Sequence, residues 1–243
     1  MLSLPLSDGS TCAISPTKII ALGLNYHEHI AESHSVKVQG FTKDVPDEPV
    51  LFPKLPSSII GPKDPIVIPT FLLDYTFEQL RVDYEAELAI IVKDRCKHVP
   101  EAEAFDHVLG YTCLNDVSQR NLQTGDRSGW FRGKSLDTFC PVGPRVVLHG
   151  DIGDPQALRV RCRLNGITVQ DGTTRDMIFS IPAIIAFVSK NFTLEPGDII
   201  STGTPSGVGP VKHGDVVEID IEGIGVLENP VVEEWRFPFP GPL

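Results

Sequence analysis

A strand-like alternation of side chains is the clearest pattern along the chain. In residues 84–92, YEAELAIIV, successive side chains point to opposite faces of an extended backbone. One face then carries Tyr84, Ala86, Leu88, Ile90 and Val92, and the other carries Glu85, Glu87, Ala89 and Ile91. Apolar or alternating stretches predict four further strands, at residues 18–24, 108–114, 199–202 and 215–222.

Helical patterns are fewer than strand patterns. Ser180, with Pro182 in the first turn, predicts the start of a helix that reaches about residue 191. Asn25, with Glu28 three positions later as in a capping box, predicts a short helix through about residue 33. The strands do not alternate with helices as they do in a parallel βαβ sheet. The pattern therefore predicts a β-dominated α+β fold.

A proline-rich segment covers residues 46–69. Its seven prolines exclude a regular helix and predict loop and edge strand wrapped over the domain. Residues 1–17 are typical of a short strand and turn ahead of the main body. No repeat, low-complexity tract or linker divides the remainder, so we expect residues 18–243 to form a single domain.

The two glutamates in residues 84–92 are the first candidates for chemistry. Glu85 and Glu87 share a face, with Cα atoms about 6.5–7 Å apart given the rise of a strand. Such a pair destabilises an apolar strand unless a positive group neutralises it, and Asp116, after the next strand, is placed to complete a set of three. An all-oxygen site favours a hard cation, Mg²⁺ or Mn²⁺ before Zn²⁺. The alternative is a solvated edge strand with surface glutamates.

Composition restricts the possible partners. The chain has 21 basic and 32 acidic residues, a net charge of −11, so it would repel nucleic acid and anionic lipid. An anionic substrate would therefore need local positive charge at its site. The beginning of the chain lacks the basic region of a secretory signal, and no apolar run approaches the length of a membrane span. Five widely spaced cysteines without a CxxC pair indicate free thiols, so we expect an intracellular, cytoplasmic protein.

Seven segments in order along the chain carry a family resemblance. They cover nearly the whole chain from residue 18 to about residue 231 and read LGLNYHEHIAE, EPVLFPK, DYEAELAIIV, YTCLNDVSQR, GKSLDTFCPVGP, RLNGITVQDGTTRDMIFSIPAIIAFVS and LEPGDIISTGTPSGVG. Together they resemble the fumarylacetoacetate hydrolase family, in its small single-domain branch of acylpyruvate hydrolases, 2-hydroxyhepta-2,4-diene-1,7-dioate isomerases and oxaloacetate tautomerases. The resemblance implies a mixed β-roll or sandwich with a few peripheral helices, usually as a homodimer. It also implies that Glu85, Glu87 and Asp116 are Mg²⁺ ligands.

A histidine and a glutamate are candidates for proton transfer. His29 and Glu32 lie three positions apart and so share one face of a short helix. A carboxylate that holds one imidazole nitrogen leaves the other nitrogen to take a proton from water. The resemblance implies such a dyad, because the family's hydrolases have one in the matching lid helix. An exposed surface pair is the alternative.

Other polar residues match positions that contact substrate in the family. Lys134 lies in GKS, but a phosphate loop is excluded because Ser128 stands where that motif needs glycine. The resemblance implies instead that Lys134 reaches the substrate carboxylate or the developing oxyanion. Arg120 and Gln123 match residues that orient the oxo acid. Gly203 and Thr204 match a carboxylate-binding turn, although Gly-Thr-Pro is also an ordinary turn sequence.

These residues predict an enzyme that acts on a small 2-oxo acid. The expected reaction is hydrolysis of a C–C bond in an acylpyruvate-type substrate, through an enolate that Mg²⁺ and Lys134 stabilise. Mn²⁺ suits three carboxylates equally well. Two alternatives stay open: decarboxylation, tautomerisation or isomerisation at the same metal site, and a non-catalytic protein that binds 2-oxo acids.

Overall fold

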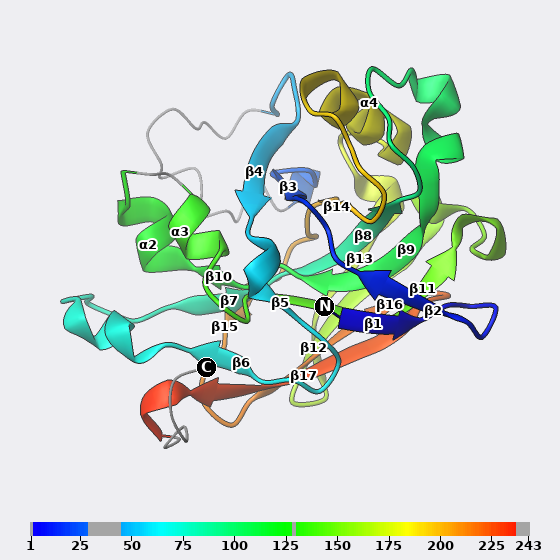
Figure 1. Ribbon diagram of the computed structural model, residues 1–243. Helices are drawn as coiled ribbons and strands as arrows, with labels where there is room; N and C mark the ends of the chain where they lie inside the picture. The colour runs from blue at the N-terminus through cyan, green and yellow to red at the C-terminus, as the bar shows by residue number, and fades with distance from the viewer. Residues whose placement is uncertain (1, 29–44, 128–129, 237–243) are drawn as a thin grey trace.

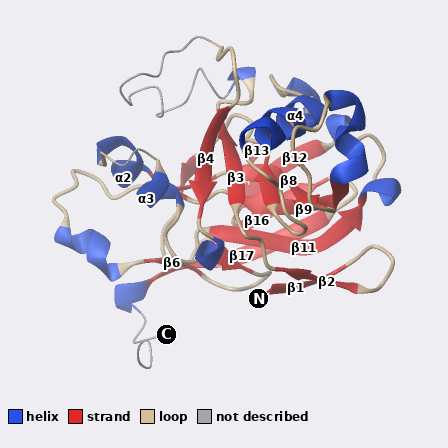
Figure 2. Ribbon diagram, turned by 45° about the horizontal axis from the view of Figure 1, so that its top comes forward, coloured by secondary structure: helices blue, strands red, loops and turns tan. Residues whose placement is uncertain are grey.

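Two large sheets dominate the computed structural model, which describes residues 2–28, 45–127 and 130–236 (Figures 1 and 2). Within these residues, the larger sheet has seven strands in the order β4 (Val50–Lys54), β3 (Ile19–Gly23), β14 (Ile199–Ser201), β8 (Ala86–Val92), β9 (Val108–Asn115), β11 (Cys140–Leu148) and β5 (Ile59–Ile60). The other has five, in the order β13 (Ile167–Thr173), β12 (Arg159–Leu164), β16 (Val216–Ile221), β17 (Gly225–Glu233) and β6 (Ile66–Ile68).

Two smaller sheets complete the described strands. They are the three-stranded sheet β10 (Ser118–Gln119), β7 (Val82–Tyr84) and β15 (Gly209–Pro210), and the hairpin of β1 (Leu2–Pro5) and β2 (Thr11–Ile14). Most neighbouring strands are antiparallel, but β14 with β3, β11 with β5 and β17 with β6 are parallel. The predicted β-dominated α+β fold, with mixed sheets, is confirmed.

The helices lie at the margins of the sheets. The α-helices of the described ranges are α2 (Arg120–Gly125), α3 (Phe131–Lys134) and α4 (Ile181–Asn191). Short 3₁₀ turns are η2 (Pro56–Ser58), η3 (Thr70–Asp74), η4 (Glu101–His107), η5 (His149–Asp151), η6 (Pro155–Ala157), η7 (Thr174–Asp176) and η8 (Glu234–Arg236). Ser180 caps α4 as predicted, because its Oγ accepts from Ala183 N at 3.3 Å and Pro182 lies in the first turn. Within the same ranges, no helix combines the length and apolar composition that a bilayer crossing requires.

Strand β8 is buried on both faces because it lies in the middle of the larger sheet. Leu88 and Ile90 pack in one apolar cluster with Ile219 of the five-stranded sheet. Ala89 and Ile91 pack in another cluster, which includes side chains of the β1–β2 hairpin. The alternation predicted for residues 84–92 is therefore correct. The burial of both faces of β8 excludes the alternative, a solvated edge strand.

The predicted strand at residues 84–92 is nevertheless interrupted at Glu85. Residues up to Tyr84 pair in the three-stranded sheet, and residues from Ala86 pair in the larger one. At the break, Glu85 N donates to Asn115 Oδ1 at 2.9 Å, and Glu85 O accepts from Asp116 N at 2.9 Å. A side-chain bond thus replaces one bond of the strand ladder, and Glu85 stands at the junction of two sheets.

The segment at residues 46–69 contains short strands, as its prolines predicted. β4 and β5 are the two outermost strands of the larger sheet, and β6 is an outermost strand of the five-stranded sheet. Pro53 lies within β4 and is exposed, which edge position allows because proline cannot donate to a ladder.

The helix predicted to begin after Asn25 is described only at its start, His27 and Glu28; its remainder lies outside the described residues. Asn25, predicted as the cap, uses its side chain to join distant segments. Its Oδ1 accepts from Phe179 N at 2.8 Å and its Nδ2 donates to Thr202 O at 2.8 Å.

The division of the chain into an N-terminal segment, residues 1–17, and a catalytic domain, residues 18–243, remains a proposal. The junction between them is fastened by Asp198, whose side chain is fully buried. Asp198 Oδ1 accepts from Thr17 N and Thr17 Oγ1, both at 2.8 Å, and Oδ2 accepts from Lys18 Nζ and from Glu195 N. Burial alone would raise the pKa of Asp198, but these hydrogen bonds lower it below the ordinary value.

Asp198→Ala is expected to lower the free energy of unfolding at pH 7 by about 1–3 kcal/mol, because it leaves buried donors unsatisfied. The folded-state pKa is lowered, so the stabilisation is complete above the unfolded pKa of about 4 and is lost as pH falls through the folded pKa. Urea titrations at pH 7 and pH 3 measure the difference, with the exposed Asp74→Ala as control. A destabilisation equally large at both pH values would contradict this linkage.

Candidate active site and metal centre

Three carboxylates meet at the junction between the sheets. Glu85 lies between β7 and β8, Glu87 lies on β8, and Asp116 directly follows β9. One carboxylate oxygen from each lies within 4.8 Å of the other two. The three residues are only 4%, 1% and 0% exposed, so they are not surface carboxylates.

Strand pairing explains why residues far apart in the sequence meet. β8 and β9 are antiparallel, with Glu87 opposite Leu114 and Ala86 opposite Asn115. The end of β9 therefore runs back to the start of β8, where Asp116 arrives beside Glu85. Burying these carboxylates without partners would be strongly unfavourable. The stability of the site therefore depends on the side chains that contact them.

Three buried cations contact these carboxylates. Lys134 Nζ donates to Glu85 Oε2 and to Asp116 Oδ2, each at 2.6 Å. Lys54 Nζ donates to Asp116 Oδ1 at 2.6 Å and also to Lys134 O. Arg120 Nη2 donates to Glu85 Oε1 at 2.5 Å. The buried carboxylates Glu85 and Asp116 are thus each neutralised by two buried cations.

Arg120 also ties the site to two further polar side chains. Its Nε donates to Asp83 Oδ2 at 2.7 Å, and its Nη1 donates to Gln123 Oε1 at 2.9 Å. Burial alone would lower the pKa of Arg120, but Glu85 and Asp83 raise it above its ordinary value. The guanidinium therefore stays charged and holds Glu85 in one orientation.

Glu87 is held from the opposite side by strand β14 and the turn after it. Its Oε2 accepts from Ser201 Oγ at 2.5 Å and from Gly203 N at 2.9 Å. Burial and the neighbouring Asp116 and Glu85 carboxylates raise the pKa of Glu87 well above the ordinary value, although the Ser201 bond opposes this. Added positive charge, as from a metal ion, would favour the ionised form of Glu87.

Lys134 is enclosed between the carboxylates and an aromatic ring. Its Nζ lies 5.0 Å from the centroid of the Phe52 ring, within the range of a cation–π interaction. Burial alone would lower the pKa of Lys134, but Asp116 and Glu85 raise it above its ordinary value. The side chain is an ammonium in this arrangement.

Thr204 lies in the turn that holds Glu87. Its Oγ1 accepts from Gln170 Nε2 at 2.9 Å, and Gln170 Oε1 accepts from Ala86 N at 3.0 Å. Gly203 has φ +92°, in the left-handed region that favours glycine, and an added Cβ would lie 2.9 Å from Asn25 Cβ. The turn is therefore fixed against β8, with its backbone N–H directed at Glu87.

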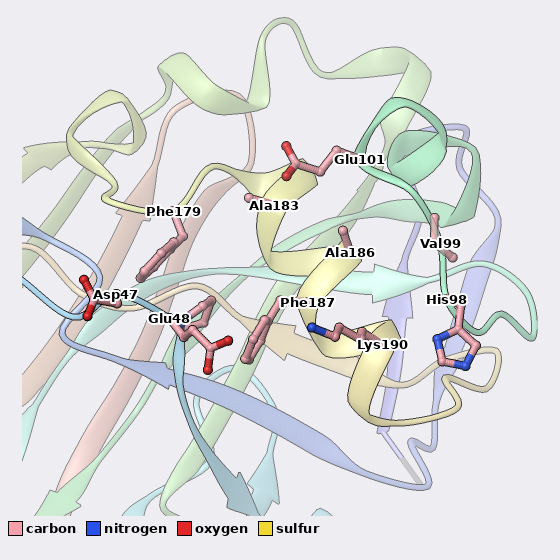
Figure 3. A pocket seen from close by; sticks show the side chains of 11 residues that line it. Asp47, Glu48, His98, Val99, Glu101, Phe179, Ala183, Ala186, Phe187 and Lys190 are labelled. Carbon is pink, nitrogen blue, oxygen red and sulfur yellow. The ribbon is translucent and has the colours of Figure 1, made fainter.

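A small cavity of about 10 Å³ borders the cluster, with room for about one water-sized particle. It is lined in part by predicted site residues, namely Glu85, Glu87, Gln123, Lys134 and Thr204. A larger hollow of about 450 Å³ lies against α4, where Figure 3 shows Ala183, Phe187 and Lys190 on the helix. None of the three carboxylates lines that hollow, so we do not assign the chemistry to it.

Comparison with known protein families identifies the relatives of the chain. Residues 18–232 match the model of the fumarylacetoacetate (FAA) hydrolase C-terminal family. The chain belongs to this family. The resemblance expected from the seven sequence segments is confirmed.

Relatives in the family carry names of three kinds of enzyme. The mitochondrial oxaloacetate tautomerase fahd2 of Xenopus laevis is 45% identical over 226 residues, which cover 90% of this chain and 66% of the relative. The crystal structure of 2-hydroxyhepta-2,4-diene-1,7-dioate isomerase from Mycobacterium marinum is 42% identical, with a TM-score of 0.77, and the match covers 91% of this chain and 76% of that one.

A third relative was solved with manganese(II) and pyruvate bound. It is the maleylpyruvate hydrolase of Sphingobium sp. SYK-6 in complex with manganese(II) and pyruvate, 37% identical with a TM-score of 0.73, covering 91% of this chain and 72% of that one. The chain is thus related to hydrolases, isomerases and tautomerases of small oxo acids, and a member of the family binds a divalent metal.

The donor atoms of this family member fit a hard divalent cation. Glu85, Glu87 and Asp116 supply only oxygen, the ligand that Mg²⁺ and Mn²⁺ prefer. The cation would share Glu85 and Asp116 with Lys134, whose ammonium lies against an oxygen of each. The three carboxylates are therefore suited to hold the metal, with Lys134 beside it.

Ser201→Ala is expected to weaken divalent-metal binding by about 10–100-fold, because replacing a residue that hydrogen-bonds to a metal ligand commonly lowers metal affinity by this factor. The variant removes the hydroxyl that donates to Glu87 at 2.5 Å and changes no predicted ligand. Isothermal titration with Mn²⁺ measures the change. The exposed Ser57→Ala is the control, and equal affinity in both variants would show that Ser201 does not position Glu87.

The structure brings together eight of the ten predicted site residues. Glu85, Glu87, Asp116, Lys134, Arg120, Gln123, Gly203 and Thr204 form one connected group. His29 and Glu32 lie outside the described residues. Their role as a dyad stays a prediction from the sequence.

Sequence reasoning missed four buried polar residues of the site: Lys54, Asp83, Asn115 and Ser201. The sequence did indicate Asp83, because it continues the alternation of Glu85 and Glu87 and so shares their face of the strand. The sequence also indicated Lys54, because it is an isolated charge at the end of an apolar stretch, VLFPK. Nothing in the sequence indicated Asn115 and Ser201, since short polar residues at strand ends are common.

Proposed function

We propose that this protein is a Mg²⁺-dependent hydrolase of a C–C bond in an acylpyruvate-type 2-oxo acid. The observation that carries the proposal is the meeting of three buried carboxylates with Lys134, Lys54 and Arg120 at one point. When bound, the metal supplies a Lewis acid that binds substrate oxygens and neutralises negative charge developing on them. Mn²⁺ is the alternative cofactor.

The chain's own residues are assigned complementary roles. Lys134, held as an ammonium by Glu85 and Asp116, attracts the substrate carboxylate and stabilises the developing oxyanion. Arg120 fixes Glu85 and positions Gln123, which lines the cavity. Thr204 and Gly203 form the turn that is assigned to bind the substrate carboxylate together with Lys134.

The proton-transfer step is assigned to His29 and Glu32 on the basis of sequence. Glu32 would orient the imidazole of His29, which takes a proton from water as the water attacks the distal carbonyl. The C–C bond then breaks, its electron pair passes to the pyruvate fragment, and pyruvate leaves after protonation. The acyl group leaves as a carboxylic acid, so the step consumes one water.

Cellular context and partners are part of the same proposal. All five cysteines are free thiols, which suits a reducing compartment such as the cytoplasm. We further propose a homodimer with a small-molecule substrate and neither nucleic acid nor membrane as partner, because family members are usually dimeric and the chain is acidic.

A second candidate function is tautomerisation or decarboxylation of oxaloacetate at the same carboxylates. The 45% identity to a protein named oxaloacetate tautomerase favours it. Such reactions also generate negative charge on the 2-oxo oxygen, but they need no attacking water. The predicted His29–Glu32 dyad therefore separates the two functions.

The test is release of pyruvate from acetylpyruvate by purified protein, with Mg²⁺ and with EDTA, beside an oxaloacetate assay. Metal-dependent release that falls at least about 10²-fold in His29→Ala, the lower end for a lost general base, supports the hydrolase. The matched control is His27→Ala, an exposed histidine close in sequence. Turnover of oxaloacetate alone, unchanged in His29→Ala, would replace hydrolysis by the second function. Tight binding of pyruvate without turnover would indicate a binding protein.

A further inference from the structure

A second cluster of metal-ligating side chains lies away from the three carboxylates. Asp94, Cys96 and His107 each present a ligand atom within 4.8 Å of the other two. Asp94 and Cys96 follow β8, and His107 ends the 3₁₀ turn η4 that leads into β9. β8 itself separates this cluster from Glu87 by about 20 Å, at the rise of a strand.

The three side chains already face one another. His107 Nδ1 lies 2.6 Å from Asp94 Oδ1. Cys96 carries a free thiol, is only 7% exposed, and within the described ranges no hydrogen bond engages its sulfur. A sulfur, a carboxylate oxygen and an imidazole nitrogen thus lie close enough together to bind one cation.

Backbone bonds hold the cluster in place. Cys96 N donates to Leu194 O at 3.1 Å, and Leu194 N donates to Cys96 O at 3.0 Å. Lys93 N donates to His107 O at 2.9 Å. The backbone at Cys96 and at His107 is thus fixed before any ligand binds, which reduces the ordering that binding requires.

We propose that Asp94, Cys96 and His107 form a binding site for a divalent transition metal of the Zn²⁺ class. Sulfur and imidazole donors favour Zn²⁺ over Mg²⁺, in contrast to the all-oxygen carboxylate cluster. The Asp94–His107 hydrogen bond is exchanged for two metal bonds, and Cys96 binds as thiolate after giving its proton to solvent. Asp94 and His107 side chains are 49% and 26% exposed, so water reaches the remaining coordination position.

The proposed site has a structural consequence. A metal bound there joins the chain after β8 to the start of β9, beyond the last paired residues of the two strands. This inference does not depend on the proposed enzymatic function, because it concerns different residues and a different class of metal.

Titration of the full chain with Co²⁺ tests the site. Cobalt bound to a thiolate gives a charge-transfer absorption in the near ultraviolet, whereas cobalt bound to carboxylates alone does not. We expect this absorption to saturate as Co²⁺ is added and to be lost in Cys96→Ser. In Asp94→Asn and His107→Gln the apparent dissociation constant should rise by at least tenfold. Excess Zn²⁺ should displace the cobalt and remove the absorption.

Cys12→Ser is the matched control, because Cys12 is a free thiol outside the cluster and should leave the titration unchanged. Circular dichroism establishes that each variant is folded. Asp94→Asn changes a half-exposed side chain and keeps the test valid if Cys96→Ser does not fold. Absorption that is absent in the unchanged protein, or that persists in Asp94→Asn with unaltered affinity, would overturn the proposal.

Discussion

Glu87→Gln is expected to lower kcat/KM for acetylpyruvate by about 10³-fold. A bound metal stabilises the negative charge that develops in the transition state by several kcal/mol, and this stabilisation depends on an intact metal site. Glutamine retains an oxygen that can accept from Ser201 and Gly203, so the local fold is preserved while the negative charge is lost. The variant should also lose any rise in melting temperature that Mg²⁺ produces in the unchanged protein. Steady-state pyruvate release and thermal unfolding, each with Mg²⁺ and with EDTA, measure the two effects.

Stability in EDTA provides an independent check of the same substitution. Burial and the neighbouring Asp116 and Glu85 carboxylates disfavour ionised Glu87, so removing its charge should leave the metal-free protein as stable as before or more stable. The exposed Glu78→Gln serves as control. An Mg²⁺-induced rise in melting temperature that is equal in Glu87→Gln and in the control would show that Glu87 is not a metal ligand.

Lys54→Met is expected to lower the free energy of unfolding by about 3–5 kcal/mol, because it leaves a buried carboxylate without one of its partners. The Nζ of Lys54 lies 2.6 Å from Asp116 Oδ1, and both side chains are 0% exposed. Methionine keeps the volume of the stem and removes the charge. For a chain of this length the melting temperature should fall by roughly 10 °C. Chemical denaturation at pH 7 measures the loss.

The matched control for Lys54→Met is Lys212→Met, since Lys212 is exposed and its loss should change stability by less than about 0.5 kcal/mol. If Lys54→Met were as stable as the control, the pair would contribute nothing to the fold.

The sequence predicted the strands well where alternation was strong. Residues 84–92 and 215–222 have a period of two that only an extended backbone satisfies, and both are strands in the fold. The break at Glu85 was not predictable, because it arises from a bond between Glu85 N and the side chain of Asn115, thirty positions away. Local patterning contains no information about such tertiary contacts.

The sequence likewise predicted only part of the candidate site. Alternation predicted that Glu85 and Glu87 share one face, the order of the strands predicted Asp116 beside them, and the structure brings the three carboxylates together. Their neutralisation by Lys54 was not predicted, since nothing in VLFPK indicates which carboxylate the lysine meets. Family resemblance supplied Lys134 and Arg120, whose contacts with Glu85 depend on short helices that no periodicity signals.

The pairing of β3 with β14 has a consequence for how the protein is made. These strands join residues 19–21 to residues 199–201 in parallel, and the next residues supply the amide that holds Glu87. Closing so long a loop is slow because its entropy is lost before the contacts form. A nascent chain that ends before residue 201 contains all three carboxylates but lacks Ser201 and Gly203, the two residues that hold the Glu87 carboxylate. We therefore expect the metal to be acquired after synthesis, once nearly the entire chain has left the ribosome.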